Sequence, residues 1–370
     1  MPALNPPFRA DHVGSLLRPR TVLDARAKFV AEHIDATEKR AVEDAAIAHA
    51  IRSQHDVGLQ SITDGEFRRE WFHLDFLQEL AGVTVSGAIA ASSDSATSVG
   101  FTPPRLEVTG KLGHQHNIQV DDYSFVASHT TRTPKVCIPS PTMVHFRGGR
   151  AAIDINSYPD MEVFFADLAA SYRAEIDALY VAGCRYIQLD DTNLAYLCDP
   201  KMRAGAVERG DDPNELPRTY AALINAVISG RPSDLTVGIH LCRGNFRSTH
   251  FAEGGYEPVA EVLFTELDVD TYFLEYDDER SGDFTPLRFV PANKTVVLGI
   301  VSSKHAALEP QSELRARIDE AARYVPIDQL CLSPQCGFSS TVHGNIITPE
   351  DQWAKLRLVV QSHEPISGRP

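Results

Sequence analysis

The chain is poor in cysteine and in long apolar runs, and each scarcity excludes a class of protein. Six cysteines are scattered over 370 residues, whereas disulfide scaffolds are short and dense in cysteine. No stretch reaches the roughly 18–20 uninterrupted apolar residues that a membrane helix needs. The first residues also lack the charged and apolar segments of a secretion signal. We therefore expect a cytoplasmic protein with reduced cysteines and no membrane partner.

Positive charge is also scarce. The chain has 35 basic and 50 acidic residues, which gives a formal net charge of −15. Proteins that bind nucleic acid neutralise its phosphates with lysine and arginine, so we expect no nucleic-acid partner. The sequence leaves the oligomeric state open, and a homo-oligomer is compatible with it.

Short apolar runs alternate with amphipathic helical patterns along the chain. Buried parallel strands have this appearance, because both of their faces are covered. Eight runs are candidate strands: 12–16, 61–66, 135–141, 186–191, 236–242, 271–277, 295–301 and 329–336. The main helical patterns cover 21–57, 158–182, 216–229, 254–267, 308–324 and 350–362. Eight such units predict an α/β fold, a (β/α)8 TIM barrel that occupies residues 1–370 as a single domain.

Two other features refine this prediction. No G-x-G-x-x-G follows the first run, which argues against an open dinucleotide-binding sheet. Residues 81–134 are too long for a plain loop and contain two β-like pieces, 82–91 and 105–112. We predict that they form a β-hairpin insertion between the second and third strands, near the mouth of the barrel.

Polar residues gather at the ends of the predicted strands, where (β/α)8 barrels place their chemistry. His240 and Cys242 stand two apart on one strand, so their side chains point to the same face. Imidazole and thiolate together suit a zinc-like ion. Glu275 and Cys336, each at the end of a later strand, could complete a tetrahedral set. An H-x-C pair in a buried strand also occurs as ordinary core, and the residues alone leave both interpretations open.

Carboxylates gather at the same strand ends. Glu66 follows the second run, and Asp190 and Asp191 end the fourth. Such carboxylates can act as general acid and base or can hold a substrate ammonium group. Asp191 or Thr192 could instead cap a following helix. The remaining cysteines are predicted to be small buried hydrophobes: Cys137, Cys184, Cys198 and Cys331.

With these motifs the chain resembles the catalytic C-terminal domain of cobalamin-independent methionine synthases, and more closely their short single-barrel bacterial relatives. The resemblance runs from about Phe8 to Trp353. It implies a zinc ion held by four residues: His240, Cys242, Glu275 and Cys336. It also implies that homocysteine is bound through its carboxylate by Ser15, in Val13-Gly14-Ser15, and through its ammonium by Glu66 and Asp190.

The chain departs from the family pattern on the side of the methyl donor. A tryptophan that stacks on the pterin corresponds to Phe146, and a folate-contacting glutamate corresponds to Tyr196. The family's proton-donating histidine falls near Lys304, with His305 one position on. There is also no room for the N-terminal barrel of the larger enzymes. The thiol half of the site is therefore retained, and the donor is left open.

The resemblance implies a zinc-dependent S-methyltransferase that makes methionine from homocysteine, with a methyl-folate or another methyl carrier as donor. Zinc deprotonates a coordinated thiol, and the thiolate is the nucleophile. One alternative is a zinc-dependent alkyltransferase that opens an epoxide with a small thiol such as coenzyme M. Such a thiol has no ammonium, so Glu66 and Asp190 argue against it. The other alternative is a non-catalytic zinc or small-molecule binding protein, against which the many buried charges argue.

Overall fold

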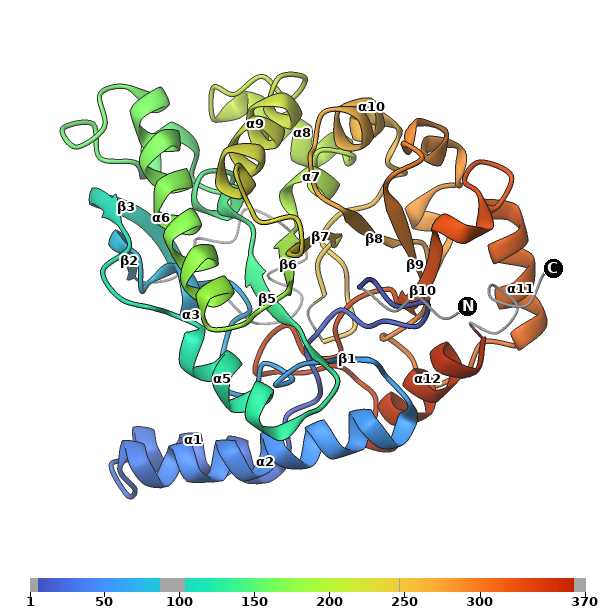
Figure 1. Cartoon of the computed structure of the whole chain (residues 1–370). Helices are drawn as coiled ribbons and strands as arrows, with labels where there is room; N and C mark the ends of the chain where they lie inside the picture. The colour runs from blue at the N-terminus through green and yellow to red at the C-terminus, as the bar shows by residue number, and fades with distance from the viewer. Residues whose placement is uncertain (1–5, 87–103, 246, 363–370) are drawn as a thin grey trace.

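A six-stranded parallel sheet forms the centre of the molecule (Figure 1). The computed structural model describes residues 6–86, 104–245 and 247–362. The six strands pair in chain order: β5 (Val136–Pro139), β6 (Tyr186–Asp191), β7 (Thr236–Leu241), β8 (Thr271–Glu275), β9 (Thr295–Val301) and β10 (Leu330–Pro334). Each lies within one of the predicted runs, and every strand residue from β6 to β10 is buried apart from the first residues of β7 and β9. The predicted α/β class with a parallel sheet is confirmed.

The first two predicted strands differ from what was expected. The second is reduced to β1 (Ser61–Ile62), which pairs in parallel with β4 (Thr133–Pro134). The prediction of a strand at 12–16 was wrong, because this segment runs without a ladder and only Ala10 forms an isolated bridge, to Leu332. The backbone leaves the strand conformation at Gly14, which has φ +133°. A Cβ at this position would lie 2.5 Å from the Cys137 sulfur, so only glycine fits. Closure into an eight-stranded barrel therefore stays a prediction.

Buried polar contacts hold this first segment in place instead of a ladder. The Lys135 ammonium lies 3.3 Å from the Asp11 carboxylate, and both side chains are fully buried. Lys135 also donates to the His12 carbonyl at 2.6 Å and lies 4.1 Å from the centre of the Phe273 ring. Breaking a buried ion pair leaves an uncompensated charge and is costly, so this network fixes the chain that leads into Ser15.

Helices surround the sheet (Figure 1). The single helical pattern at 21–57 is divided in two, because Asp35 begins a new helix with a reciprocal capping box to Glu38. The helices are α1 (Arg20–Val30), α2 (Ala36–Val57), α3 (Leu74–Leu77), α5 (Val120–His129), α6 (Met161–Val181), α7 (Asn193–Tyr196), α8 (Pro200–Glu208), α9 (Leu216–Ile228), α10 (Glu257–Thr265), α11 (Gln311–Ala321) and α12 (Pro349–Ser362). Among the described residues, no helix combines the length and the apolar character that crossing a membrane requires.

The two β-like pieces of residues 81–134 pair with each other. β2 (Ala81–Ser86) and β3 (Arg105–Gly113) are antiparallel, as a hairpin requires. Residues 87–103, which include the end of the first predicted piece and the turn, lie outside the described residues. The hairpin itself therefore stays a prediction. The helix α5, which follows β3, was not predicted, and it contributes to a pocket beside the candidate site.

Candidate active site

Two cysteines and a histidine meet where β7 and β10 end. His240, Cys242 and Cys336 are buried, and their ligand atoms all lie within 4.8 Å of one another. The two sulfurs are 3.2 Å apart, well beyond the roughly 2.05 Å of a disulfide bond. Neither ring nitrogen of His240 has a hydrogen-bond partner of standard geometry. An imidazole left without partners beside two thiols fits a metal site of the zinc type.

The three side chains also shift one another's protonation. Contact with Cys242 lowers the pKa of Cys336 well below its ordinary value, although burial opposes this. The same contact, together with burial, raises the pKa of Cys242. Burial by itself would lower the pKa of His240, but Cys336 and two nearby carboxylates outweigh it and raise that pKa. The cluster thus favours one thiolate. A metal held by all three side chains needs both cysteines deprotonated and the imidazole neutral, so an ion that binds here must displace protons from Cys242 and His240, whose pKa values are raised.

Glu275, the fourth predicted ligand, is bound differently. It ends β8 and is fully buried, but it is not part of the group whose ligand atoms lie within 4.8 Å. One carboxylate oxygen contacts Lys304 at 3.0 Å and Arg280 at 2.5 Å, and the other accepts from the Arg243 backbone N–H at 2.7 Å. Burial would raise its pKa, but the charges of Lys304, Arg243 and Arg280 outweigh it and lower that pKa. The role of Glu275 as a ligand stays a prediction.

The two predicted proton donors lie in different surroundings. Lys304 is nearly buried, and its ammonium contacts Glu275. His305, the next residue, is exposed. Of the two, Lys304 lies against Glu275, and its role as a proton donor stays a prediction.

A second buried cluster contains the predicted ammonium-binding acids. Glu66, Asp190 and Cys137 offer ligand atoms within 4.8 Å of one another. Asp190 pairs in register with His240 on the neighbouring strand, so the two clusters adjoin. Cys137 was predicted to be a plain core residue. It is buried, but its sulfur faces the carboxylates, and its place two residues before the end of β5 was the signal for this.

Local structure fixes the orientation of Glu66. Gly65 and Glu66 both have positive φ, of 68° and 59°, a conformation that a residue with a side chain seldom adopts. The Asp64 carboxylate accepts from the Glu66 N–H at 2.8 Å and stabilises this turn. The turn directs the Glu66 side chain inward, where it reaches Asp190.

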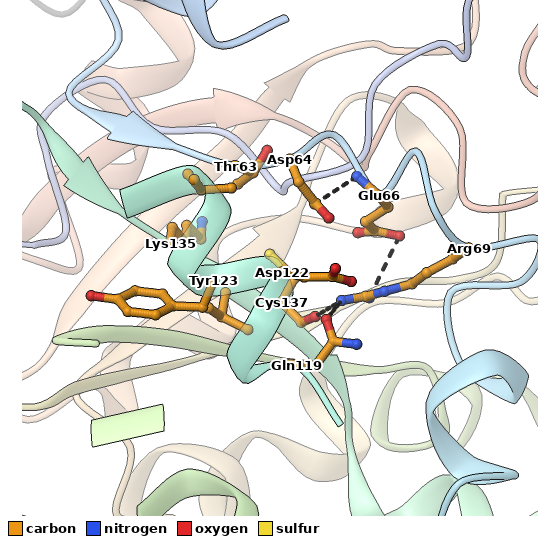
Figure 2. A pocket seen from close by; sticks show the side chains of 11 residues that line it. Thr63, Asp64, Glu66, Arg69, Gln119, Asp122, Tyr123, Lys135 and Cys137 are labelled. Atoms are coloured by element: carbon orange, nitrogen blue, oxygen red, sulfur yellow. Dashed lines mark hydrogen bonds and ion pairs between the residues drawn. The ribbon is translucent and has the colours of Figure 1, made fainter. Parts of the chain in front are cut away.

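A pocket opens beside Glu66 (Figure 2). Arg69 extends toward Glu66 along one side of it. Asp122 and Tyr123 of α5, together with Gln119 just before that helix, line it as well. A Glu66 oxygen and an Arg69 nitrogen lie 3.8 Å apart, and neither has a hydrogen-bond partner. A polar ligand or a water molecule in this pocket could supply the missing hydrogen bonds of both side chains.

Burial shifts both acids strongly. It raises the pKa of Glu66 to about 8, against the attraction of Arg69, and the pKa of Asp190 to about 6, against the attraction of His240. The cluster therefore does not carry its full negative charge at neutral pH. A positively charged group that binds between the two acids would favour the ionised form of both.

Replacement of Glu66 by glutamine is expected to raise stability relative to the original protein, and more so as pH rises. The folded carboxyl keeps its proton up to a pKa of about 8, whereas the unfolded one releases it near 4.5. The contribution of Glu66 to stability is therefore lost across this interval, and the glutamine variant has no such group to titrate, so the difference in stability between the two proteins grows with pH. Thermal unfolding at the two ends of the interval measures this. The exposed Glu208→Gln variant is the control, and a Glu66→Gln effect as independent of pH as the control's would contradict the prediction.

Ser15 contacts the segment that follows Cys336. Its hydroxyl accepts from the Ser339 N–H at 3.2 Å. A Cβ on Gly337 would come within 2.0 Å of that hydroxyl, so the glycine after Cys336 lets the two segments touch. Ser15 thus lies against the turn that carries Cys336.

Phe146 and Tyr196, the two residues that depart from the family pattern, lie next to each other. Phe146 and Tyr196 are buried, with ring centroids 6.0 Å apart. The Arg209 guanidinium lies 5.2 Å from the centre of the Phe146 ring.

Asp191 supports the start of a helix. Its carboxylate accepts a hydrogen bond from the Leu194 N–H in the first turn of α7.

Comparison with known proteins places the chain in a family. The catalytic-domain model of the cobalamin-independent synthases matches residues 8–354. The uncharacterized protein YxjH of Bacillus subtilis (strain 168) is 47% identical, over 96% of this chain and 93% of YxjH. The methionine synthase of Pyrococcus furiosus is 25% identical, over 88% of this chain and 84% of that protein.

Solved structures agree. A Listeria monocytogenes protein, assigned provisionally as a vitamin-B12 independent methionine synthase, is 40% identical and matches over 99% of both chains with a TM-score of 0.79. A B12-independent methionine synthase from Shewanella sp. W3-18-1, in complex with selenomethionine, is 18% identical and has the same fold, with a TM-score of 0.74 over 97% of both chains. Fold and site together define an α/β protein with a buried thiol–imidazole cluster beside paired acids. The chain belongs to the cobalamin-independent synthase family, as its motifs predicted.

Proposed function

We propose that the protein is a zinc-dependent S-methyltransferase that converts homocysteine to methionine, with a methyl-folate or another methyl carrier as donor. The observation that carries this proposal is the pair of adjoining buried clusters, His240 with two cysteines and Glu66 with Asp190. Membership of the cobalamin-independent synthase family supports it. We also propose that the six-stranded sheet, β1–β4 and the segment at 10–16 together form the wall of a (β/α)8 barrel.

In this proposal the metal is held by four residues: His240, Cys242, Glu275 and Cys336. Zinc, when bound, would lower the pKa of a substrate thiol and favour the nucleophilic thiolate. Two cysteine thiolates and a carboxylate would leave the site with a net negative charge, which keeps a bound thiolate reactive.

The remaining residues orient the amino acid. Glu66 and Asp190 would bind the ammonium group, and Ser15 would bind the carboxylate. Because Asp190 pairs with His240 in register, an amino acid held there has its side chain beside the thiol–imidazole cluster. Fixing both reactants in this way can supply a large part of the rate acceleration.

Methyl transfer forms a sulfur–carbon bond and breaks the bond between the methyl group and its carrier, which leaves with the bonding electrons. A nitrogen leaving group must then gain a proton. We propose Lys304 for this step, because its ammonium lies against Glu275, and not His305, which is exposed.

A product assay on the purified protein tests the proposal. Homocysteine is offered with methyltetrahydrofolate, its polyglutamate or methylcobalamin, and coenzyme M is offered with a small epoxide. Methionine formed with one of the methyl donors, by protein that holds about one zinc per chain, is the expected result. Product only from the epoxide would replace the proposal by the alkyltransferase, and zinc binding with no turnover would favour a binding protein.

A further inference from the structure

The Glu275 carboxylate accepts contacts from several donors of the protein itself. Lys304 and Arg280 both contact its first oxygen, which also accepts a long hydrogen bond of 3.4 Å from Gln335. The second oxygen accepts from the Arg243 backbone N–H. The fully buried Glu275 contacts three cations, because the Arg243 guanidinium also lies 3.8 Å from its second oxygen. Any ion that takes Glu275 as a ligand must therefore compete with them.

Lys304 and Arg280 are themselves held in place by further contacts. Arg280 also contacts Asp277 at 3.1 Å and forms a short ion pair with Asp278. Asp277 in turn accepts a hydrogen bond from Ser302, whose hydroxyl oxygen lies 3.3 Å from the Lys304 backbone N–H and accepts from it. Lys304 and Arg280 thus reach Glu275 from the segments after β9 and β8, through one connected network.

We infer that Lys304 and Arg280 are positioning residues that compete with the metal for Glu275 and so set how tightly the metal is held. This inference rests on the zinc site of the proposed function. Each cation stabilises the carboxylate where it now lies, at Lys304 and Arg280 and outside the thiol–imidazole group. Removing Lys304 or Arg280 leaves the buried negative charge with less compensation, although Arg243 remains. The carboxylate then gains more from a dipositive ion than it does in the original protein.

Replacement of Lys304 is therefore expected to tighten metal binding. Substitutions around metal ligands usually weaken binding, by about 10- to 100-fold, because they remove support for the ligand. Here the expected change has the opposite sign. Lys304→Met should bind zinc at least about 10-fold more tightly, and Arg280→Met should change affinity in the same direction. Lys304→Arg, which keeps the charge, should restore the original affinity.

Competition with a zinc chelator on the full-length protein, stripped of metal and reloaded, measures these affinities. The matched control is Lys294→Met, since Lys294 makes a lysine–carboxylate contact of similar length, 3.2 Å to Asp268. Lys294 directly precedes β9, whereas Glu275 ends the parallel strand β8, so the two lie at opposite ends of this strand pair. X-ray absorption of the zinc-loaded variants counts the ligands, and Lys304→Met should gain oxygen coordination. Circular dichroism checks that each variant is folded. If Lys304→Met does not fold, the zinc affinity of Arg280→Met decides the question.

Unchanged or weaker zinc binding in the folded Lys304→Met and Arg280→Met variants overturns the inference while leaving the proposed zinc site intact. Equal tightening in Lys294→Met would also overturn it, because the effect would then not depend on Glu275. If the original protein binds no zinc, the proposed function fails and the inference fails with it. The two failures are therefore distinguishable in a single titration series.

Discussion

Cys242→Ser and Cys336→Ser are each expected to lose bound zinc and to lower the rate of methionine formation by about 1,000-fold or more. A serine hydroxyl does not ionise near neutral pH and is a hard ligand, whereas zinc in such sites prefers thiolate. Either change also removes one of two sulfurs that lie 3.2 Å apart and shift each other's pKa. Zinc content and product formation are measured on the same preparations.

The matched control for the cysteine variants is Cys198→Ser. Cys198 is also buried, but its thiol donates to the Leu194 carbonyl at 3.6 Å within a helical turn, a contact that a serine hydroxyl can keep. This variant should retain zinc and activity. Folded Cys242→Ser and Cys336→Ser proteins with a full complement of zinc and normal turnover would refute the metal site.

Asp190→Asn is expected to lower kcat/KM for homocysteine by about 100- to 1,000-fold, the scale of removing one partner of a buried charge pair. The substitution keeps the shape of the side chain and removes the charge that would face the ammonium group. A thiol without an amino group, such as coenzyme M, has no such contact to lose. Steady-state kinetics with both thiols therefore distinguish recognition of the amino acid from general damage to the site.

Asp191→Asn provides the control for Asp190. The two aspartates are adjacent and buried, but Asp191 accepts hydrogen bonds from the Leu194 N–H and the Thr142 hydroxyl. Its substitution should lower stability and leave the discrimination between the two thiols unchanged. An Asp190→Asn variant that affects both thiols equally would contradict the proposed ammonium site.

Much of the fold could be predicted because local signals were strong. The six buried strands are short and mostly apolar runs, and each lies where its run predicted it. The failures occurred where tertiary contacts outweigh local preference. The segment at 12–16 has a strand-like pattern, but its backbone leaves the strand conformation at Gly14, where φ is +133° and the chain packs against Cys137. The two helices within 21–57 could have been separated, because Asp35 and Glu38 have the spacing of a capping box.

The site was predictable in its chemistry and less so in its contacts. The alternation of His240 and Cys242 along one strand, and the position of Cys336 at the end of another, were sufficient to expect that they meet. No spacing rule indicated that Lys304 and Arg280 would reach Glu275, since they come from different loops. Cys137 escaped notice because a buried cysteine is most often a plain core residue.

The sequence by itself determined the α/β class, the family and the residue types that gather at the strand ends, because strand periodicity and motif spacing are local properties of the chain. Only the tertiary structure decided which of these residues touch. It placed the acids beside the thiol–imidazole cluster through the pairing of β6 with β7. It also surrounded Glu275 with cations, because long side chains from separate loops converge on one buried charge that must be compensated.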